Sequence, residues 1–269
     1  MSKKSIIVLL AFVFSYGGVA AAAGPFEVTW LYVQHRVNED PAKGTFNRLC
    51  FLLQDDAGNY ASTPALLEDV MLVDPNGSIL TLTDPGFDPG DYYGGSYDDA
   101  RGQWYYNPTQ LHEPTFYYKI TEPLPKGIYY LFATYDGYSS ECSYLFNGEV
   151  ALPMVESSSF QIPAKLDASG ALIINWTPSA KLFHFTDSNP KIKTSARAEI
   201  DAYQGSTYTG YLIARVSTHL GRFYVPKSVL SQLSAMGDRF EFRAQLRTND
   251  NSNRTYSKFV DITNLISPP

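Results

Sequence analysis

Short runs in which apolar and polar residues alternate cover most of the chain, and turn-forming residues separate them. The strongest run lies within residues 121–136, where Ile-Tyr-Tyr-Leu-Phe-Ala-Thr-Tyr follows two prolines and Gly127. The run Phe240-Glu-Phe-Arg-Ala-Gln-Leu246 alternates strictly and follows Gly237. Alternation with a period of two is typical of β-strands with one buried face, so we expect Phe240 and Leu246 to be buried and the opposite face to be in water.

Further strands are predicted from the same pattern and from the enrichment of aromatic and β-branched residues. They lie at 26–37, 46–54, 70–73, 79–82, 104–106, 115–120, 141–146, 172–176, 197–203 and 211–216. Asp74-Pro-Asn-Gly77 suits a tight turn and predicts a hairpin between 70–73 and 79–82. Convincing helical spacing of apolar residues is confined to 226–233. We therefore expect an all-β chain with one short helix.

Regular alternation stops after Thr83, and the segment 84–106 is rich in Asp, Tyr, Gly and Pro, so we expect a long ordered loop. Ca²⁺ takes oxygen ligands from carboxylates and carbonyls, which makes the aspartates of this loop a candidate calcium site. These residues are Asp84, Asp88, Asp91, Asp98 and Asp99. Their spacing is not that of an EF-hand, and the alternative is that they cap turns beside Pro and Gly.

The same segment contains a high density of aromatic residues, which offer large contact areas. They are Tyr92, Tyr93, Tyr97, Trp104, Tyr105 and Tyr106. Our first hypothesis is a protein interface or self-association surface formed by these rings. The alternative is a carbohydrate-binding or accessory module of a polysaccharide-processing system, in which the rings stack on sugars. A third interpretation is that the rings only seal the edge of the sandwich or pack on the second domain.

Composition supports real hydrophobic cores, because 44% of the 269 residues are apolar and 14% are aromatic. Charge is divided unevenly: residues 24–163 have 6 basic and 19 acidic side chains, whereas residues 164–269 have 13 basic and 8 acidic ones. This asymmetry would steer a charged partner, favour head-to-tail association or hold the two halves together; the alternative is solvated surfaces that merely differ. An acidic first half without a basic run argues against nucleic acid as a partner.

The N-terminus has the features of a secretory signal peptide over residues 1–23. Lys3 and Lys4 precede an apolar core at 6–14, and an alanine run ends at Ala23. We therefore expect export to the periplasm or the cell exterior, with no membrane span after cleavage; the alternative is an N-terminal membrane anchor.

Two cysteines, Cys50 and Cys142, follow the signal peptide. In an exported protein an even pair predicts a disulfide, and two free thiols are the alternative. The histidines lie far apart in the sequence, at positions 35, 112, 184 and 219, without metal-type spacing. We find no set of residues typical of catalysis and expect a non-enzymatic protein without a cofactor, calcium excepted.

The order of predicted strands resembles tandem immunoglobulin-like or fibronectin type III-like β-sandwiches. Gly127-Ile-Tyr129 and Gly237-Asp-Arg-Phe240 are similar to the entry of the penultimate strand in such modules, where an aromatic residue fixes the corner, and Trp176 lies early in the second half. We therefore expect, after the signal peptide at 1–23, an acidic sandwich at 24–163 and a basic sandwich at 164–269. The fold by itself indicates no activity, and our interpretation is a non-enzymatic binding or assembly component.

Overall fold

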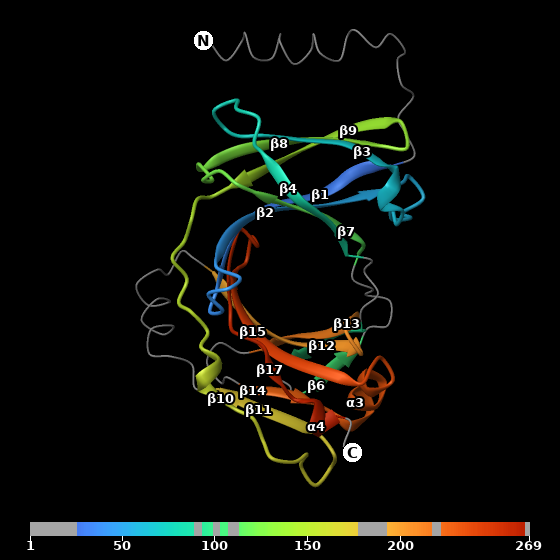
Figure 1. The fold of residues 1–269 in the computed structure, drawn as a ribbon, viewed down its shortest axis with the longest axis vertical. Helices are drawn as coiled ribbons and strands as arrows, with labels where there is room; N and C mark the ends of the chain where they lie inside the picture. Colours follow the sequence, from blue (N-terminus) through green and yellow to red (C-terminus); the bar gives the residue numbers. More distant parts are fainter. Residues whose placement is uncertain are drawn as a thin grey trace.

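A computed structural model describes residues 26–88, 93–98, 103–106, 113–176, 193–216 and 222–266. The predicted all-β class is confirmed (Figure 1). The strands are β1 (Glu27–Asn38), β2 (Thr45–Gln54), β3 (Leu67–Val73), β4 (Leu82–Asp88), β5 (Tyr93–Asp98), β6 (Gln103–Tyr106), β7 (Thr115–Ile120), β8 (Gly127–Tyr135), β9 (Tyr138–Phe146), β10 (Phe160–Gln161), β11 (Leu172–Trp176), β12 (Thr194–Gln204), β13 (Thr207–Val216), β14 (Arg222–Val225), β15 (Arg239–Thr248), β16 (Asn253–Tyr256) and β17 (Val260–Asp261). The helical elements are η1 (Pro64–Leu66), η2 (Ser157–Ser159), α3 (Lys227–Ser234) and α4 (Thr263–Ile266).

In the first half of the chain two sheets enclose a hydrophobic core. One has the strand order β4-β7-β2-β1 and the other the order β3-β8-β9. With the hairpin β5–β6 left out, these orders correspond to the ABED and CFG sheets of an immunoglobulin constant-type sandwich. Phe51, Phe116, Leu131 and Phe146 fill the space between the sheets and are almost completely buried.

The second half repeats the two-sheet arrangement, with β16-β15-β12-β13 on one side and β10-β11-β14 on the other (Figure 1). Its core contains Leu172, Phe223 and Phe242, and α3 adds Val229, Leu230 and Leu233 to it, as their helical spacing predicted. Strand order and burial together give an immunoglobulin- or fibronectin-like β-sandwich fold.

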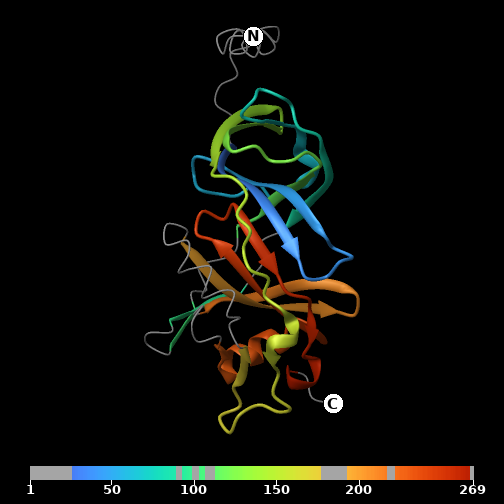
Figure 2. The same cartoon turned by 90° about the vertical axis from the view of Figure 1, so that its left-hand side faces the viewer.

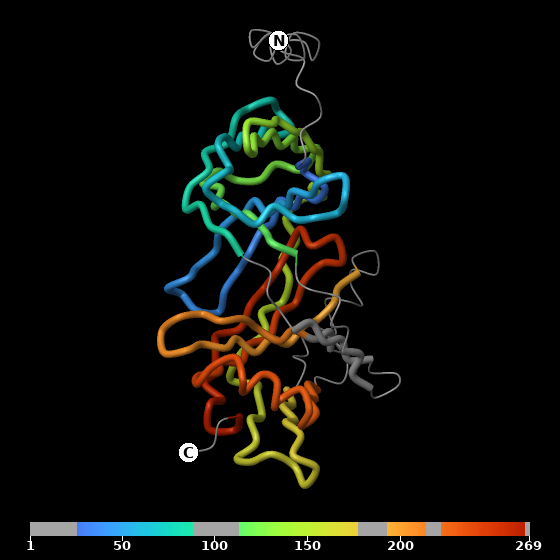
Figure 3. The backbone as a smooth tube through the Cα atoms, turned by 90° about the vertical axis from the view of Figure 1, so that its right-hand side faces the viewer, coloured from blue at the N-terminus to red at the C-terminus, as the bar shows by residue number. Residues whose placement is uncertain are grey.

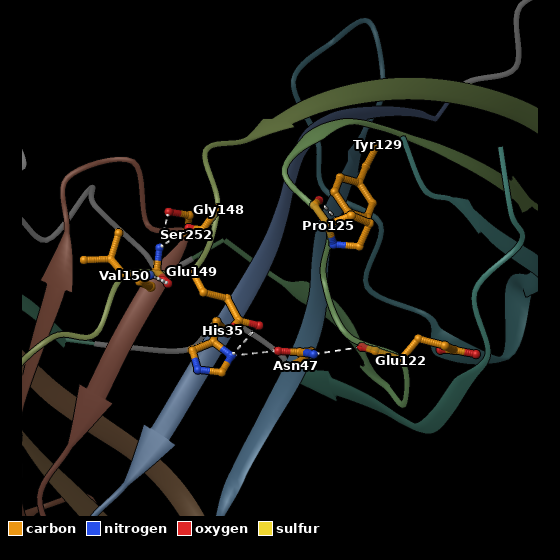
Figure 4. Close-up of polar contacts among 10 residues, drawn as sticks. His35, Asn47, Glu122, Pro125, Tyr129, Gly148, Glu149, Val150 and Ser252 are labelled. Atoms are coloured by element: carbon orange, nitrogen blue, oxygen red, sulfur yellow. Dashed lines mark hydrogen bonds and ion pairs between the residues drawn. The ribbon is translucent and has the colours of Figure 1, made fainter. Parts of the chain in front are cut away.

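Tyr129 fixes the corner before β8, as the sequence pattern indicated. The side chain is completely buried, and its hydroxyl donates a hydrogen bond of 2.7 Å to the carbonyl oxygen of Pro125 (Figure 4). This is the geometry of the tyrosine corner found in immunoglobulin-like sandwiches. It pins the chain that crosses from one sheet to the other.

The predicted hairpin between 70–73 and 79–82 is present only next to its turn. The amide of Leu80 donates to the carbonyl of Leu72 over 2.9 Å across the bridge between Val73 and Ile79, and beyond that bridge the two segments part. β3 pairs with β8 along its length, while the chain after the turn crosses to the other sheet and continues as β4. The hairpin does not extend further because the chain from Leu82 on pairs with β7 in the other sheet.

The disulfide between Cys50 and Cys142 is also wrong, because both residues are free thiols. Cys142 contacts the core of the first half from β9. Cys50 lies on the other face of β2, with its Sγ atom 3.7 Å from Gln34 and 3.8 Å from Arg36. Alternation along β2 turns Cys50 away from the core and therefore away from Cys142.

The two halves are joined by strand pairing as well as by the connecting segment. β1 runs parallel to β16 in register from His35 with Asn253 to Asn38 with Tyr256. The buried side chain of Asn253 accepts from the amide of Val150 at 2.9 Å and donates to the carbonyl of Gly148 at 3.0 Å (Figure 4). One continuous sheet therefore runs through both halves.

Side chains on either side of this pairing strengthen the junction. His35 Nδ1 lies 2.9 Å from the side-chain oxygen of Asn47 and 3.5 Å from Glu149 (Figure 4). The turn after β1 reaches the second half (Figure 3), where the carboxylate of Glu39 accepts hydrogen bonds from the backbone amides of Ser157 and Lys258. In the described part of the chain, no helix has the length and hydrophobicity needed to span a bilayer.

Candidate functional site

The segment 84–106, predicted as a loop, contains three strands. β4 pairs with β7, and a register shift between Thr83 and Gly86 accommodates Pro85, which has no amide hydrogen for the ladder. β5 and β6 form a hairpin that places Tyr97 opposite Trp104. The prediction failed because glycine and aspartate have low strand propensity, whereas the aromatic residues Tyr97 and Trp104 favour strands and are partners in the hairpin.

The hairpin joins the second half of the molecule although it belongs to the first half by sequence (Figures 1 and 2). β5 runs parallel to β13, with Tyr93 beside Leu212, and β6 is the last strand in the order of the long sheet. Tyr105 and Tyr106 occupy positions opposite Ser96 and Gly95. Tyr92 lies outside the described residues.

The aspartates proposed as calcium ligands are only partly placed. Asp84, in a left-handed conformation with φ of 48°, forms an ion pair of 2.9 Å with Lys119, and Asp88 ends β4. Asp98 ends β5, while Asp91 and Asp99 lie outside the described residues. Within the described ranges, no three His, Cys, Asp or Glu side chains are grouped so as to hold a metal. The calcium site stays a prediction.

A second candidate lies on the face of β15 that we expected to be in water. Arg243 is half-buried, and Gln245 and Arg247 are buried, so that expectation was wrong. The long sheet curves so that this face of β15 turns toward β1 and β2 of the first half (Figure 1). Arg36 on β1 and Arg243 on β15 accordingly both lie near the ring of Tyr256, with Cζ 5.7 and 4.9 Å from its centroid.

Three arginines form a row across adjacent strands of this face. Arg36 on β1 is the direct partner of Arg254 on β16, and Arg254 is the direct partner of Arg247 on β15. We call Arg36, Arg254 and Arg247 the arginine row. A further cation, Arg48 on β2, is the direct partner of Gln34 on β1. The guanidinium carbon of Arg48 lies 3.6 Å from the ring centroid of Tyr117.

The polar contacts of the arginine row are with neutral groups. Arg36 donates from Nε to Oε1 of Gln34 at 2.9 Å, and Arg254 donates to the hydroxyl of Tyr256 at 3.2 Å. Arg247 lies 3.4 Å from Oγ of Ser195. None of the ion pairs found among the described residues includes a member of the row. Burial, together with the nearby guanidinium groups of Arg48 and Arg254, lowers the pKa of Arg36 to about 10.

The carboxylate next to the row is already paired. Glu199 on β12 accepts from Nε of Arg243 at 2.8 Å and from Nε2 of Gln245 at 3.0 Å. Burial alone would raise the pKa of Glu199, but the charge of Arg243 outweighs it and holds that pKa below its ordinary value. Burial and the charge of Glu199 raise the pKa of Asp201 well above its usual range. This face therefore carries more positive than negative charge.

Sequence reasoning missed the arginine row because it depends on which strands become neighbours. Alternate arginines in β15 are typical of a solvated face, which is why the sequence predicted one. Only the pairing of β16 with both β1 and β15 brings Arg36, Arg254 and Arg247 together.

Comparisons with known proteins give only distant similarity. No protein-family model and no curated protein matches the chain. The BSP domain of a biofilm-associated protein is similar at 9% identity over 88% of this chain and 30% of that one, with a TM-score of 0.24. The FN1–FN3 domains of chicken CNTN1 are similar at 9% identity over 89% of this chain and 63% of that one, with a TM-score of 0.26. The chain thus spans less than two thirds of either structure, and the fold assignment rests on the strand order.

Proposed function

We propose that this chain is an exported, non-catalytic binding protein of two tandem sandwiches that recognises a protein partner through the hairpin β5–β6. By sequence the sandwiches would be residues 24–163 and 164–269, after a signal peptide at 1–23, with the strands β5, β6 and β10 of the first range joining the sheets of the second sandwich. The partner would bind in the periplasm or outside the cell, and the aspartates of 84–106 would hold calcium near this surface.

The observation that carries this proposal is the position of the hairpin in the sheet. β6 ends the strand order, and no described strand pairs with its outer side. An edge strand presents backbone donors and acceptors that an extended segment of a partner can pair with. Trp104, Tyr105 and Tyr106 occupy three of the four positions of β6, so a partner strand would pair beside a run of aromatic residues.

The test is capture of a partner by the immobilised mature protein from extracts of its own cells, with and without a calcium chelator. The double variant Tyr97→Ala/Trp104→Ala is compared with wild type and with Tyr130→Ala. Tyr130 is a matched control because its ring is 47% exposed on β8, in a different sheet. Circular dichroism checks that all three proteins fold.

A stoichiometric partner that wild type and Tyr130→Ala retain, and that the double variant loses, supports the proposal. Loss of that partner on chelation supports the calcium site. If the immobilised protein retains only polysaccharides from the extract, the carbohydrate-binding alternative replaces the proposal of a protein partner. Equal retention by the double variant and wild type would refute a role for the hairpin. Light scattering of the isolated protein tests whether the partner is a second copy of the same chain.

A further inference from the structure

We propose that the arginine row, Arg36, Arg254 and Arg247, together with the side-chain amide of Gln34, binds an oxyanion: a carboxylate, phosphate or sulfate group. This site is separate from the hairpin β5–β6. Its argument has four steps, which concern charge, unpartnered donors, local carboxylates and access.

The first step is the like charge along the row. Direct partners on adjacent strands have Cβ atoms about 4.5 to 5.5 Å apart, and like charges in these positions destabilise a sheet. Here two such pairs, Arg36 with Arg254 and Arg254 with Arg247, follow each other across three strands. Arg36 and Arg247 are each only 9% exposed, so water screens their charges poorly. An anion bound at the row would attract all three guanidinium groups and so offset the repulsion between them.

The second step is that hydrogen-bond donors beside the row have no acceptor. Gln34 is completely buried, and its Oε1 accepts from Arg36, which leaves Nε2 of the same amide without a partner in the described structure. Nε of Arg254 is buried and likewise lacks an acceptor there. Buried polar groups in folded proteins nearly always have partners, and an unpaired one costs about 1 to 3 kcal/mol. Both atoms are donors, so the group that would satisfy them is an acceptor.

The third step is that the carboxylates near the row form no ion pair with it among the described residues. Glu199 is held by Arg243 and Gln245. Asp250 accepts from the hydroxyls of Thr248 and Ser252 and from the side-chain amide of Asn147. The negative charge that the row lacks would therefore come from a bound group.

The fourth step is geometry and access. A guanidinium presents donors in a planar fork that matches the oxygens of a carboxylate or phosphate, and several such forks favour an oxyanion over chloride. Arg254, in the middle of the row, is the least buried of its three members, so an anion would reach the row beside it. The hydroxyl of Tyr256 lies next to the row and accepts a hydrogen bond from Arg254.

The experiment measures anion binding by the full mature chain near neutral pH. Isothermal titration and thermal unfolding are carried out with sodium phosphate, sodium sulfate and sodium acetate, and with sodium chloride at matched ionic strength. Arg254→Gln removes the centre of the row. Arg222→Gln is the matched control, because Arg222 is exposed on β14 in the opposite sheet. Arg247→Gln serves as a second variant if Arg254→Gln does not fold.

We expect at least one oxyanion to bind wild type and Arg222→Gln and to raise their unfolding temperature more than chloride does. Binding to Arg254→Gln should be at least tenfold weaker. In chloride, Arg254→Gln should unfold at the same temperature as wild type or higher, because the substitution relieves repulsion. The oxyanion that binds most tightly identifies the recognised group. Equal effects of all four salts on wild type, or equal binding by Arg254→Gln, would overturn the proposal.

Discussion

Arg36 and Arg254 are side-by-side partners on the parallel strands β1 and β16, and both approach Tyr256. The guanidinium carbon of Arg36 lies 5.7 Å from the ring centroid of Tyr256, and Arg254 donates to its hydroxyl at 3.2 Å. The guanidinium carbon of Arg243 lies 4.9 Å from the same centroid. Three cations therefore lie close to one buried phenol. Burial raises the pKa of Tyr256, but these charges outweigh burial and lower it to about 8.

The first prediction follows from this phenol. Absorbance titration should show one of the 20 tyrosines ionising near pH 8, and Tyr256→Phe should abolish that step. The folded-state pKa lies below the ordinary value of about 10, so folding stability should rise by about 2 to 3 kcal/mol between about pH 8 and pH 10. Below pH 8 the contribution is absent. Tyr130→Phe is the control, and an unchanged titration in Tyr256→Phe would contradict the assignment.

The second prediction concerns Glu199, the first of two carboxyl groups on β12. Glu199→Gln leaves Arg243 buried without its counter-charge and should cost about 3 to 5 kcal/mol near neutral pH. Because the pKa of Glu199 is lowered, its contribution is present above the ordinary pKa of a glutamate and is lost as pH falls. Urea denaturation from about pH 4 to 8 should show this loss in wild type and not in Glu199→Gln.

The third prediction has the opposite sign and concerns Asp201. Its pKa is raised, so ionisation of this group opposes folding, and its effect on stability becomes less favourable as pH rises above the ordinary pKa of an aspartate. Asp201→Asn should therefore match or exceed wild-type stability near neutral pH. A large destabilisation of Asp201→Asn in the same urea series would show that the carboxylate is needed in its charged form.

The fourth prediction tests the corner before β8. Tyr129→Phe removes the hydroxyl that donates to Pro125 and leaves this partly buried carbonyl without that donor. The free energy of unfolding should fall by about 1 to 3 kcal/mol. Tyr130→Phe, one residue further along β8 with an exposed ring, should change it much less. Similar losses in both variants would argue against a special role for the corner.

The fifth prediction concerns the close approach of Gly86 to Tyr117. A Cβ atom at position 86 would lie 2.1 Å from the ring, so Gly86→Ala must displace Tyr117 and with it the stacked Arg48. Overpacking of this kind costs about 1 to 3 kcal/mol. The cost should largely disappear when Gly86→Ala is made in a Tyr117→Ala background, as a double-mutant cycle would measure. An unchanged cost would place the strain in the backbone.

Local pattern predicted those parts of the fold that depend on neighbouring residues. The strand Leu172–Trp176, the buried face of α3 and the corner at Tyr129 all follow from periodicity or from a short motif. The failures share a different cause. The burial of Arg247 and the pairing of β3 with β8 depend on contacts between distant segments, which alternation along one strand does not specify.

The tyrosine-rich segment shows both outcomes within a few residues. Trp104 and Tyr106 lie in a strand, as predicted, but the preceding residues 93–98 form β5 and not a loop. Glycine and aspartate made that strand look irregular, and its parallel pairing with β13 could not be seen from local sequence.

The pairing of β1 with β16 also determines when the protein can finish folding. Glu39 and Lys258, which meet at this junction, are 219 positions apart. During synthesis β1 is therefore made long before its neighbour, and its edge stays open to other chains until the last strands emerge. Such long-range contacts slow folding, so the final step of maturation should depend on the C-terminal strands and be sensitive to truncation there.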